Sequence, residues 1–132
     1  MLAKYLKNIR AERVLSETGR NNAMEALGNS WHFNEGGIHK EFMFPTYEGA
    51  NNFMVRYNNY CSKINKKPIW KNVYNTVKIE LKDTEFENVT TQDIEIAKYL
   101  DTVYDVTLNF DNLLLEDKVA VSGVLLPKAK RE

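Results

Sequence analysis

Asn65–Thr90 reads Asn-Lys-Lys-Pro-Ile-Trp-Lys-Asn-Val-Tyr-Asn-Thr-Val-Lys-Ile-Glu-Leu-Lys-Asp-Thr-Glu-Phe-Glu-Asn-Val-Thr, and this stretch decides the fold. It opens with a loop that Pro68 and Trp70 fix in place. A predicted strand or strand pair follows. Its apolar residues share one face at every second position, with Asn75 interrupting the row: Val73, Val77, Ile79 and Leu81. The intervening residues are mostly polar, so one face of the strand should pack and the other should meet water or a partner.

The overall composition predicts a single folded domain without a strong charge preference. The chain has 132 residues, of which 43% are hydrophobic, enough for a core without disulfide support. Eighteen basic and eighteen acidic residues cancel, so no global field draws the protein to nucleic acid or an anionic membrane. The short basic run at 128–131 is interpreted as a solvated tail.

Cys61, the single cysteine, cannot form an internal disulfide, which fits a reducing intracellular compartment. It lies on the apolar face of a predicted helix, so we expect a small buried residue and not a nucleophile. The longest apolar run is well below the roughly 18 residues of a membrane span, and no secretory signal is expected.

Residues 2–15 carry Leu2, Leu6 and Ile9 at helical spacing with basic residues between them. Such a segment predicts either a mitochondrial targeting helix or a docking helix. Glu12 and Glu17 count against targeting, because transit peptides contain few acidic residues. We therefore interpret residues 1–20 as an N-terminal extension that docks on a partner, with a mitochondrial location as one alternative and a cytoplasmic one as the other.

The middle of the chain alternates helices and strands. After a break at 16–22, we expect a short helix at 23–27, a strand around Trp31 and Phe33, a hairpin turn at 36–37 and a strand at 38–44. Thr46 is expected to cap the next helix. That helix has an apolar face of residues three and four apart: Ala50, Phe53, Met54, Tyr57, Cys61 and Ile64.

Thr90 and Asp93 resemble a capping box at the start of a last helix. Its predicted apolar face consists of Ile94, Ala97, Leu100, Val103 and Tyr104. From about residue 107 onward the chain looks like an addition, with a turn at 111–112 and a strand over 119–126. The sequence thus predicts an α+β domain at 21–106, with helices on one face of a sheet, and a C-terminal extension at 107–132.

The string Asn-x-x-Pro-x-Trp-x-Asn-Val-Tyr-Asn-x-Val-x-Ile-x-Leu resembles the signature of the pterin-4a-carbinolamine dehydratase family. The resemblance runs over about 22–105 and includes Trp31, the Ile-x-Lys-x-Phe-x-Phe pattern starting at Ile38, and the Val-Thr-x-x-Asp opening of the last helix. It implies a four-stranded antiparallel sheet backed by three helices, in a dimer or tetramer. Family members dehydrate 4a-hydroxytetrahydropterin and so recycle the cofactor of aromatic amino-acid hydroxylases.

The resemblance also shows what this chain has lost. The family places a His-His pair directly before the proline, and a third histidine followed by an acid after the central strand. Here the pair reads Lys66-Lys67, the third position is Thr84, and the acid remains as Glu85. A lysine of ordinary pKa, about 10.4, has no lone pair at neutral pH. Lowering it to about 7 takes roughly 4 kcal/mol, so we expect no catalytic residues at these positions.

Three functions follow from these residues. The first is a silent family member that acts as a subunit of a larger complex, contacting other proteins through both extensions or forming a homodimer. The second is an active dehydratase in which Glu85 is the base and Lys67 the acid. The third is a pterin- or anion-binding module using Lys66 and Lys67. We expect no bound cofactor or metal, and we assign His32 and His39 to the surface.

Overall fold

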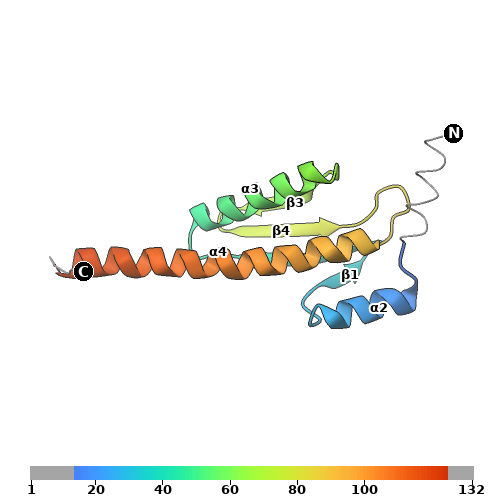
Figure 1. Cartoon of the computed structure of the whole chain (residues 1–132), viewed down its shortest axis with the longest axis horizontal. Coiled ribbons are helices and arrows are strands. Elements are labelled where there is room, and N and C mark those ends of the chain that lie inside the picture. Colours follow the sequence, from blue (N-terminus) through green and yellow to red (C-terminus); the bar gives the residue numbers. More distant parts are fainter. Residues whose placement is uncertain (1–13, 125–132) are drawn as a thin grey trace.

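The computed structural model describes the backbone of residues 14–124 and the side chains of residues 14–109. Figure 1 shows a small sheet with helices against it and one long helix that runs past the rest of the domain. In chain order the elements are α2 (Glu17–Ala26), β1 (His32–Asn34), β2 (Gly37–Met43), α3 (Tyr47–Lys63), β3 (Ile69–Val73), β4 (Thr76–Leu81) and α4 (Thr91–Val124). This confirms the predicted α+β class.

The four strands form one antiparallel sheet in the order β1-β2-β4-β3. The β1–β2 hairpin turns at Glu35 and Gly36, which both have positive φ, at 51° and 78°. The glycine is required twice over, because a Cβ there would also lie 2.3 Å from the carbonyl oxygen of Glu87. The hairpin signal read from the glycine pair is therefore confirmed.

The central stretch forms the strand pair β3 and β4, one of the two predicted alternatives, and completes the implied four-stranded sheet. The continuous apolar row from Val73 to Leu81 is wrong. Tyr74 takes a positive φ of 54°, and the chain reverses there so that Val73 pairs with Thr76. Val73 consequently lies outside the core and is 54% exposed, whereas Val77 is fully buried. Asn75 holds the turn, since its side-chain amide donates to the carbonyl oxygen of Phe44 at 2.7 Å.

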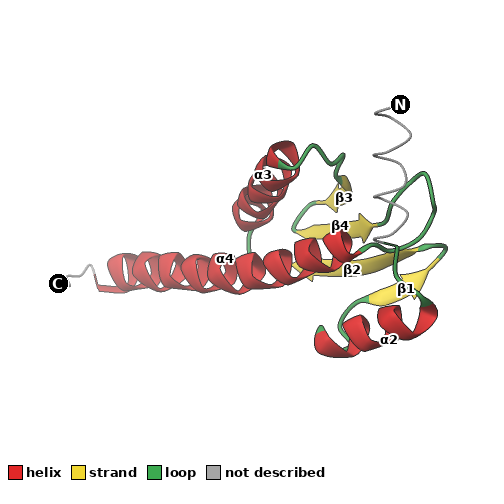
Figure 2. Cartoon of the chain, turned by 45° about the vertical axis from the view of Figure 1, so that its right-hand side comes forward, coloured by secondary structure: helices red, strands yellow, loops and turns green. Residues whose placement is uncertain are grey.

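Helices α3 and α4 lie side by side against one face of the sheet (Figure 2). The predicted α3 face is confirmed: all its members are buried except the terminal Ile64, which packs at the margin of the core. The predicted α4 face is buried as well, apart from the partly buried Tyr104. Between the helices and the sheet, the aromatic rings of Trp31, Phe42, Phe44, Phe53 and Tyr104 contact one another.

One polar side chain, Lys40, lies on the core face of β2 and is neutralised there. Its Nζ is 2.7 Å from Oδ1 of Asp101 on α4 and donates to Oγ of Ser30 at 3.2 Å. The Trp31 indole N–H also donates to the Asp101 carboxylate, at 3.2 Å. This network joins β2 to α4. It gives the Lys40 ammonium a counterion, without which its partial burial at the edge of the core would be unfavourable.

The helix starts are set by short polar side chains. Thr46 caps α3, its hydroxyl accepting from the Gly49 N–H at 3.0 Å, and Thr90 and Asp93 form the predicted capping box of α4. The start predicted for α2 is wrong, because Ser16 caps a helix that already begins at Glu17. Residues 16–22 contain weak helix formers, and the Ser16 hydroxyl, which accepts from the Gly19 N–H at 3.1 Å, supports the earlier start.

The structure tests the predicted secondary structure of the C-terminal extension as far as Val124 and that of the N-terminal extension only from Val14 onward. The turn at 111–112 and the strand over 119–126 are wrong as far as Val124, because α4 continues without a break through these residues. Of the N-terminal docking helix, residues 2–13 lie outside the described residues. Val14 is extended, bridging to Thr90, and the Leu15 N–H donates to the Val89 carbonyl oxygen at 2.9 Å.

Candidate functional site

The four positions predicted to hold the family's catalytic groups come together at one end of the domain. They lie on two loops, one following α3 and the other following β4, beside the first turn of α4. The loops enclose a hollow of about 280 Å³ lined by Asn65, Lys66, Lys67, Ile69, Lys82, Asp83, Thr84, Glu85 and Gln92. The resemblance therefore identified residues that share one site.

Lys66 is turned inward and serves as the counterion of a buried carboxylate. Its Nζ lies 3.0 Å from Oδ1 of Asp93 and donates to the Lys82 carbonyl oxygen at 3.0 Å. The Asp93 side chain is 0% exposed and that of Lys66 is 15% exposed. A buried carboxylate needs such a partner, so the Lys66 ammonium is committed to holding the loop against α4.

The local backbone explains why Lys66 points inward. Asn65, two residues after the end of α3, has a positive φ of 56°, which reverses the chain. The Lys66 N–H then donates to the Cys61 carbonyl oxygen at 2.9 Å, closing the end of the helix. Asp93 is held in place from the other side, because its Oδ2 accepts from both the backbone N–H and the hydroxyl of Thr90, at 3.0 and 3.1 Å.

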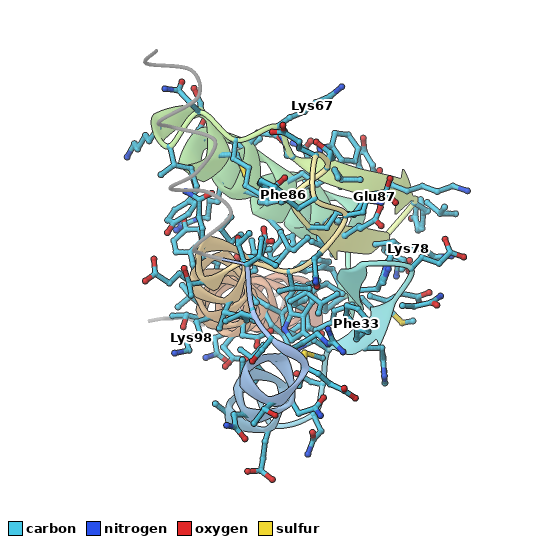
Figure 3. The ribbon with its side chains drawn as sticks, turned by 90° about the vertical axis from the view of Figure 1, so that its right-hand side faces the viewer. Phe33, Lys67, Lys78, Phe86, Glu87 and Lys98 are labelled. Carbon is cyan, nitrogen blue, oxygen red and sulfur yellow. The ribbon has the colours of Figure 1, made fainter. Side chains whose placement is uncertain are left out.

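The other three positions are exposed at the rim of the hollow. Lys67 points away from the body of the domain (Figure 3), and Thr84 and Glu85 are also solvent-exposed. Asp83 shapes this loop, since its Oδ1 accepts from the backbone N–H groups of Glu85 and Phe86, at 2.9 and 3.1 Å. The hollow thus presents ammonium and carboxylate groups but no imidazole from the described residues.

Both histidines lie elsewhere, on the face of the sheet that the helices leave open. His32 and His39 are cross-strand neighbours on β1 and β2, and His39 is paired in turn with Glu80 on β4. The His39 Nε2 lies 3.0 Å from the Asn34 carbonyl oxygen and 3.7 Å from Oε2 of Glu80. They line a second hollow of about 680 Å³ over the open face, which also includes Trp70 and Lys78.

The interior behind the catalytic positions contains two buried titratable groups. Burial raises the pKa of the Tyr57 hydroxyl, and it also raises the pKa of the Cys61 thiol, which the nearby Lys66 ammonium partly offsets. Neither side chain is exposed, and neither lines the hollow. The interpretation of Cys61 as a small core residue is confirmed.

The Lys66–Asp93 pair has no counterpart in the sequence prediction. Asp93 is visible in the sequence only as a capping residue, and its partner lies on a separate loop 27 positions earlier. Lys82, Asp83 and Gln92 also line the hollow without any distinguishing motif.

Within residues 14–109, His, Cys, Asp and Glu side chains form no group of three suited to a metal ion. No helix in the described range is long and apolar enough to cross a membrane.

Comparison with known proteins gives a consistent result. The family model described as pterin 4 alpha carbinolamine dehydratase matches residues 13–103. A protein of Prochlorococcus marinus with the provisional name pterin-4-alpha-carbinolamine dehydratase is 38% identical over 72 residues, covering 54% of this chain and 76% of the relative. A Bradyrhizobium diazoefficiens protein with the same provisional name is 33% identical over 101 residues, covering 74% of this chain and 97% of the relative.

Among solved structures, the transcriptional coactivator/pterin dehydratase from Brucella melitensis superposes with a TM-score of 0.65 at 30% sequence identity. The match covers 69% of this chain and 98% of that protein. It agrees with the fold described above, and the family model spans the loops that carry the catalytic positions. This chain therefore belongs to the pterin-4a-carbinolamine dehydratase family.

Proposed function

We propose that this protein is a catalytically silent member of the family that acts as an accessory subunit of a larger protein complex. The observation that carries the proposal is the state of Lys66. It occupies a position where the family has a histidine, and its ammonium is bound to the buried Asp93 carboxylate at 3.0 Å. A group committed to a buried ion pair is a poor proton shuttle.

The chemistry of the reaction supports the same conclusion. Dehydration of a carbinolamine needs one group to accept a proton and another to donate one, and positioned acid–base groups contribute about 10²–10⁴-fold in rate. Imidazole suits both roles because it titrates near neutral pH. At the rim of the hollow, Thr84 offers a hydroxyl and not an imidazole, and Lys67 lies exposed on a loop.

An assay with 4a-hydroxytetrahydropterin tests the proposal directly. Purified wild type should show turnover at the background rate, and Glu85→Gln should be indistinguishable from it. A triple variant, Lys66→His with Lys67→His and Thr84→His, serves as the matched comparison, because it restores the family's imidazoles to the same hollow. Turnover by the wild type that Glu85→Gln removes would establish the alternative, an active dehydratase with a rebuilt site.

The accessory role is supported by what this chain adds to the family domain. The family match ends at residue 103, whereas α4 continues to Val124. Leu2, Leu6 and Ile9 at helical spacing support a docking role for residues 1–20. A mitochondrial location of the complex is one alternative and a cytoplasmic location is the other. Affinity purification of the tagged protein from its native source should recover a stoichiometric set of subunits, and deletion of residues 1–20 should reduce that set. Recovery of the tagged protein alone would contradict the role.

A third function is the binding of an anion or pterin in the hollow. Calorimetric titration distinguishes this function from the proposed accessory role. Lys66 is already paired, which leaves Lys67 and Lys82 as the cations nearest the rim, and Lys82 lies 3.6 Å from Glu80. We therefore expect no heat of binding with pterins or inorganic phosphate. Saturable binding that Lys67→Ala abolishes would support the binding module instead.

A further inference from the structure

The face of the sheet that the helices leave open carries the larger of the two hollows described above. Helices α3 and α4 pack on the opposite face (Figure 2). The strand register sets His39 beside Glu80 and Glu80 beside Ile69, so these side chains form one row across β2, β4 and β3. The hollow of about 680 Å³ extends over all four strands, from His32 on β1 to Lys71 on β3. We call it the sheet hollow.

The sheet hollow contains a cation that no described acidic side chain pairs with. Lys71 and Lys78 stand directly opposite each other on β3 and β4. Lys78 has an acidic neighbour, because its Nζ lies 3.5 Å from Oε2 of Glu41. Lys71 forms no ion pair within residues 14–109. Like charges directly opposite each other on a sheet are unfavourable, so an anion between the two ammonium groups would be stabilised.

The middle of the sheet hollow offers hydrogen-bond acceptors. The Glu41 side chain is exposed and that of Glu80 is partly exposed, and both line the hollow. The His39 Nε2 lies 3.0 Å from the Asn34 carbonyl oxygen. A carbonyl oxygen can only accept, so Nε2 carries the hydrogen and Nδ1 of the neutral ring is an acceptor. Acceptors grouped in this way suit a ligand with several hydroxyl donors.

The size of the sheet hollow indicates a ligand larger than an inorganic ion. Its lining residues span three inter-strand spacings, which amount to about 14 Å. Its volume of about 680 Å³ lies in the range of about 300–1,000 Å³ that is usual for sites of small organic molecules. Ile69, which is partly buried in the row, provides an apolar contact for a carbon skeleton.

We propose that the sheet hollow binds a small sugar-like anion, a polyhydroxylated molecule with one phosphate or carboxylate group. The anionic group lies between Lys71 and Lys78, and the hydroxyl groups donate to Glu41, Glu80 and His39. The same two carboxylates repel a longer polyanion, so a strand of nucleic acid fits this face less well. The inference goes beyond the proposed accessory role and does not depend on it.

A titration of the full-length protein with four probes, followed by the NMR shifts of its backbone amides, tests the ligand class. Glucose 6-phosphate and gluconate carry both the anionic group and the hydroxyl groups. Glucose lacks the anionic group, and inorganic phosphate lacks the hydroxyl groups. We expect saturable binding of the first two, at least about tenfold weaker binding of inorganic phosphate, and none of glucose. The lower Kd of the first two identifies the anionic group as a phosphate or a carboxylate.

Three variants test the position of the ligand. Lys71→Gln should raise the Kd by about tenfold, because it removes one of the two ammonium groups. Glu41→Gln should lower the Kd, because it releases Lys78 from its carboxylate partner and keeps an acceptor in place. Lys67→Ala is the matched control, since this exposed lysine lines the other hollow, and the Kd should not change. Far-UV circular dichroism and urea midpoints should not fall in any variant, because all three side chains are exposed.

The inference would be overturned if neither anion bound saturably, if glucose bound as tightly as the anions, or if Lys71→Gln left the Kd unchanged. Amide shifts confined to the loops around Lys67, with binding that Lys67→Ala removes, would place the ligand in the other hollow and would also contradict it. None of these measurements involves turnover. An active wild-type enzyme would therefore remove the proposed function without affecting the sheet hollow.

Discussion

At the scale of single residues, the ion pair between Lys66 and Asp93 connects the proposed loss of catalysis to the stability of the fold. The carboxylate is fully buried, and its two oxygens bind separate partners, Lys66 on one side and Thr90 on the other. A neutral histidine in place of Lys66 could donate a hydrogen bond to Asp93 but would leave the buried carboxylate without a cation. The Lys66 ammonium supplies that cation, with its Nζ 3.0 Å from Oδ1.

Removing the lysine should therefore destabilise the domain. Lys66→Met leaves the Asp93 carboxylate buried without a cation, and we expect the free energy of unfolding to fall by about 3 kcal/mol. Urea denaturation followed by circular dichroism measures the change. Lys67→Met is the matched control, because this neighbouring lysine is exposed and its loss should cost less than about 0.5 kcal/mol. Equal effects of the two variants would show that the pair contributes little.

The thiol of Cys61 provides a second test at this scale. It is fully buried, and burial raises its pKa, so both access and the thiolate fraction are low in the native state. We expect native protein to react with a disulfide reagent at least about 100-fold more slowly than urea-unfolded protein. Ser62→Cys in a Cys61→Ala background is the control, since position 62 is exposed and should react at once. Rapid labelling of native Cys61 would place the thiol at the surface.

At the scale of elements, sequence patterns predict the features that depend on residues close together in the chain. The apolar face of α3 and the caps at Thr46 and Thr90 are predicted correctly, because helical spacing and capping involve residues only a few positions apart. The strand pair is one of the two predicted alternatives, but the place of its turn is not predicted, because Tyr74, which takes the positive φ, is an uncommon turn residue. The continuation of α4 is missed because its Asp111-Asn112 pair is also common in turns.

The hairpin between β1 and β2 gives a prediction that separates backbone strain from steric conflict. Gly36 and Gly28 have nearly equal positive φ, 78° and 75°, but only at Gly36 would a Cβ meet backbone, at 2.3 Å from Glu87 O. Gly28→Ala should cost about 1 kcal/mol, from the left-handed conformation alone. Gly36→Ala should cost about 3 kcal/mol or more, because the segment before α4 must move. Equal unfolding midpoints would contradict the close approach.

At the scale of the whole molecule, the site illustrates the limit of sequence reasoning. The resemblance places Lys66, Lys67, Thr84 and Glu85 in one site, and the structure brings them to a single hollow. The resemblance does not reveal that Lys66 is paired with Asp93, because this pairing depends on how α3, β4 and α4 pack together. The predicted boundaries at residues 20 and 106 fall inside α2 and α4.

The buried hydroxyl and thiol groups predict how global stability varies with pH. Burial raises the pKa of Tyr57, Cys61 and Tyr104 above their ordinary values of 10.0, 9.0 and 10.0. Unfolded chains therefore lose these protons first as pH rises. The stabilising contribution is complete below about pH 9 and falls as pH increases beyond that value. Urea midpoints measured between neutral pH and pH 10.5 should decline, and Tyr57→Phe should decline less steeply.

We propose that this protein has kept the family's fold and lost the family's reaction. Initial-rate measurement with 4a-hydroxytetrahydropterin, comparing wild type with Glu85→Gln and with no protein, tests it most directly. The structure predicts the same background rate in all three, because Lys66 is held by Asp93 and no imidazole from the described residues faces the hollow. Wild-type turnover clearly above background, reduced by Glu85→Gln, would contradict the account.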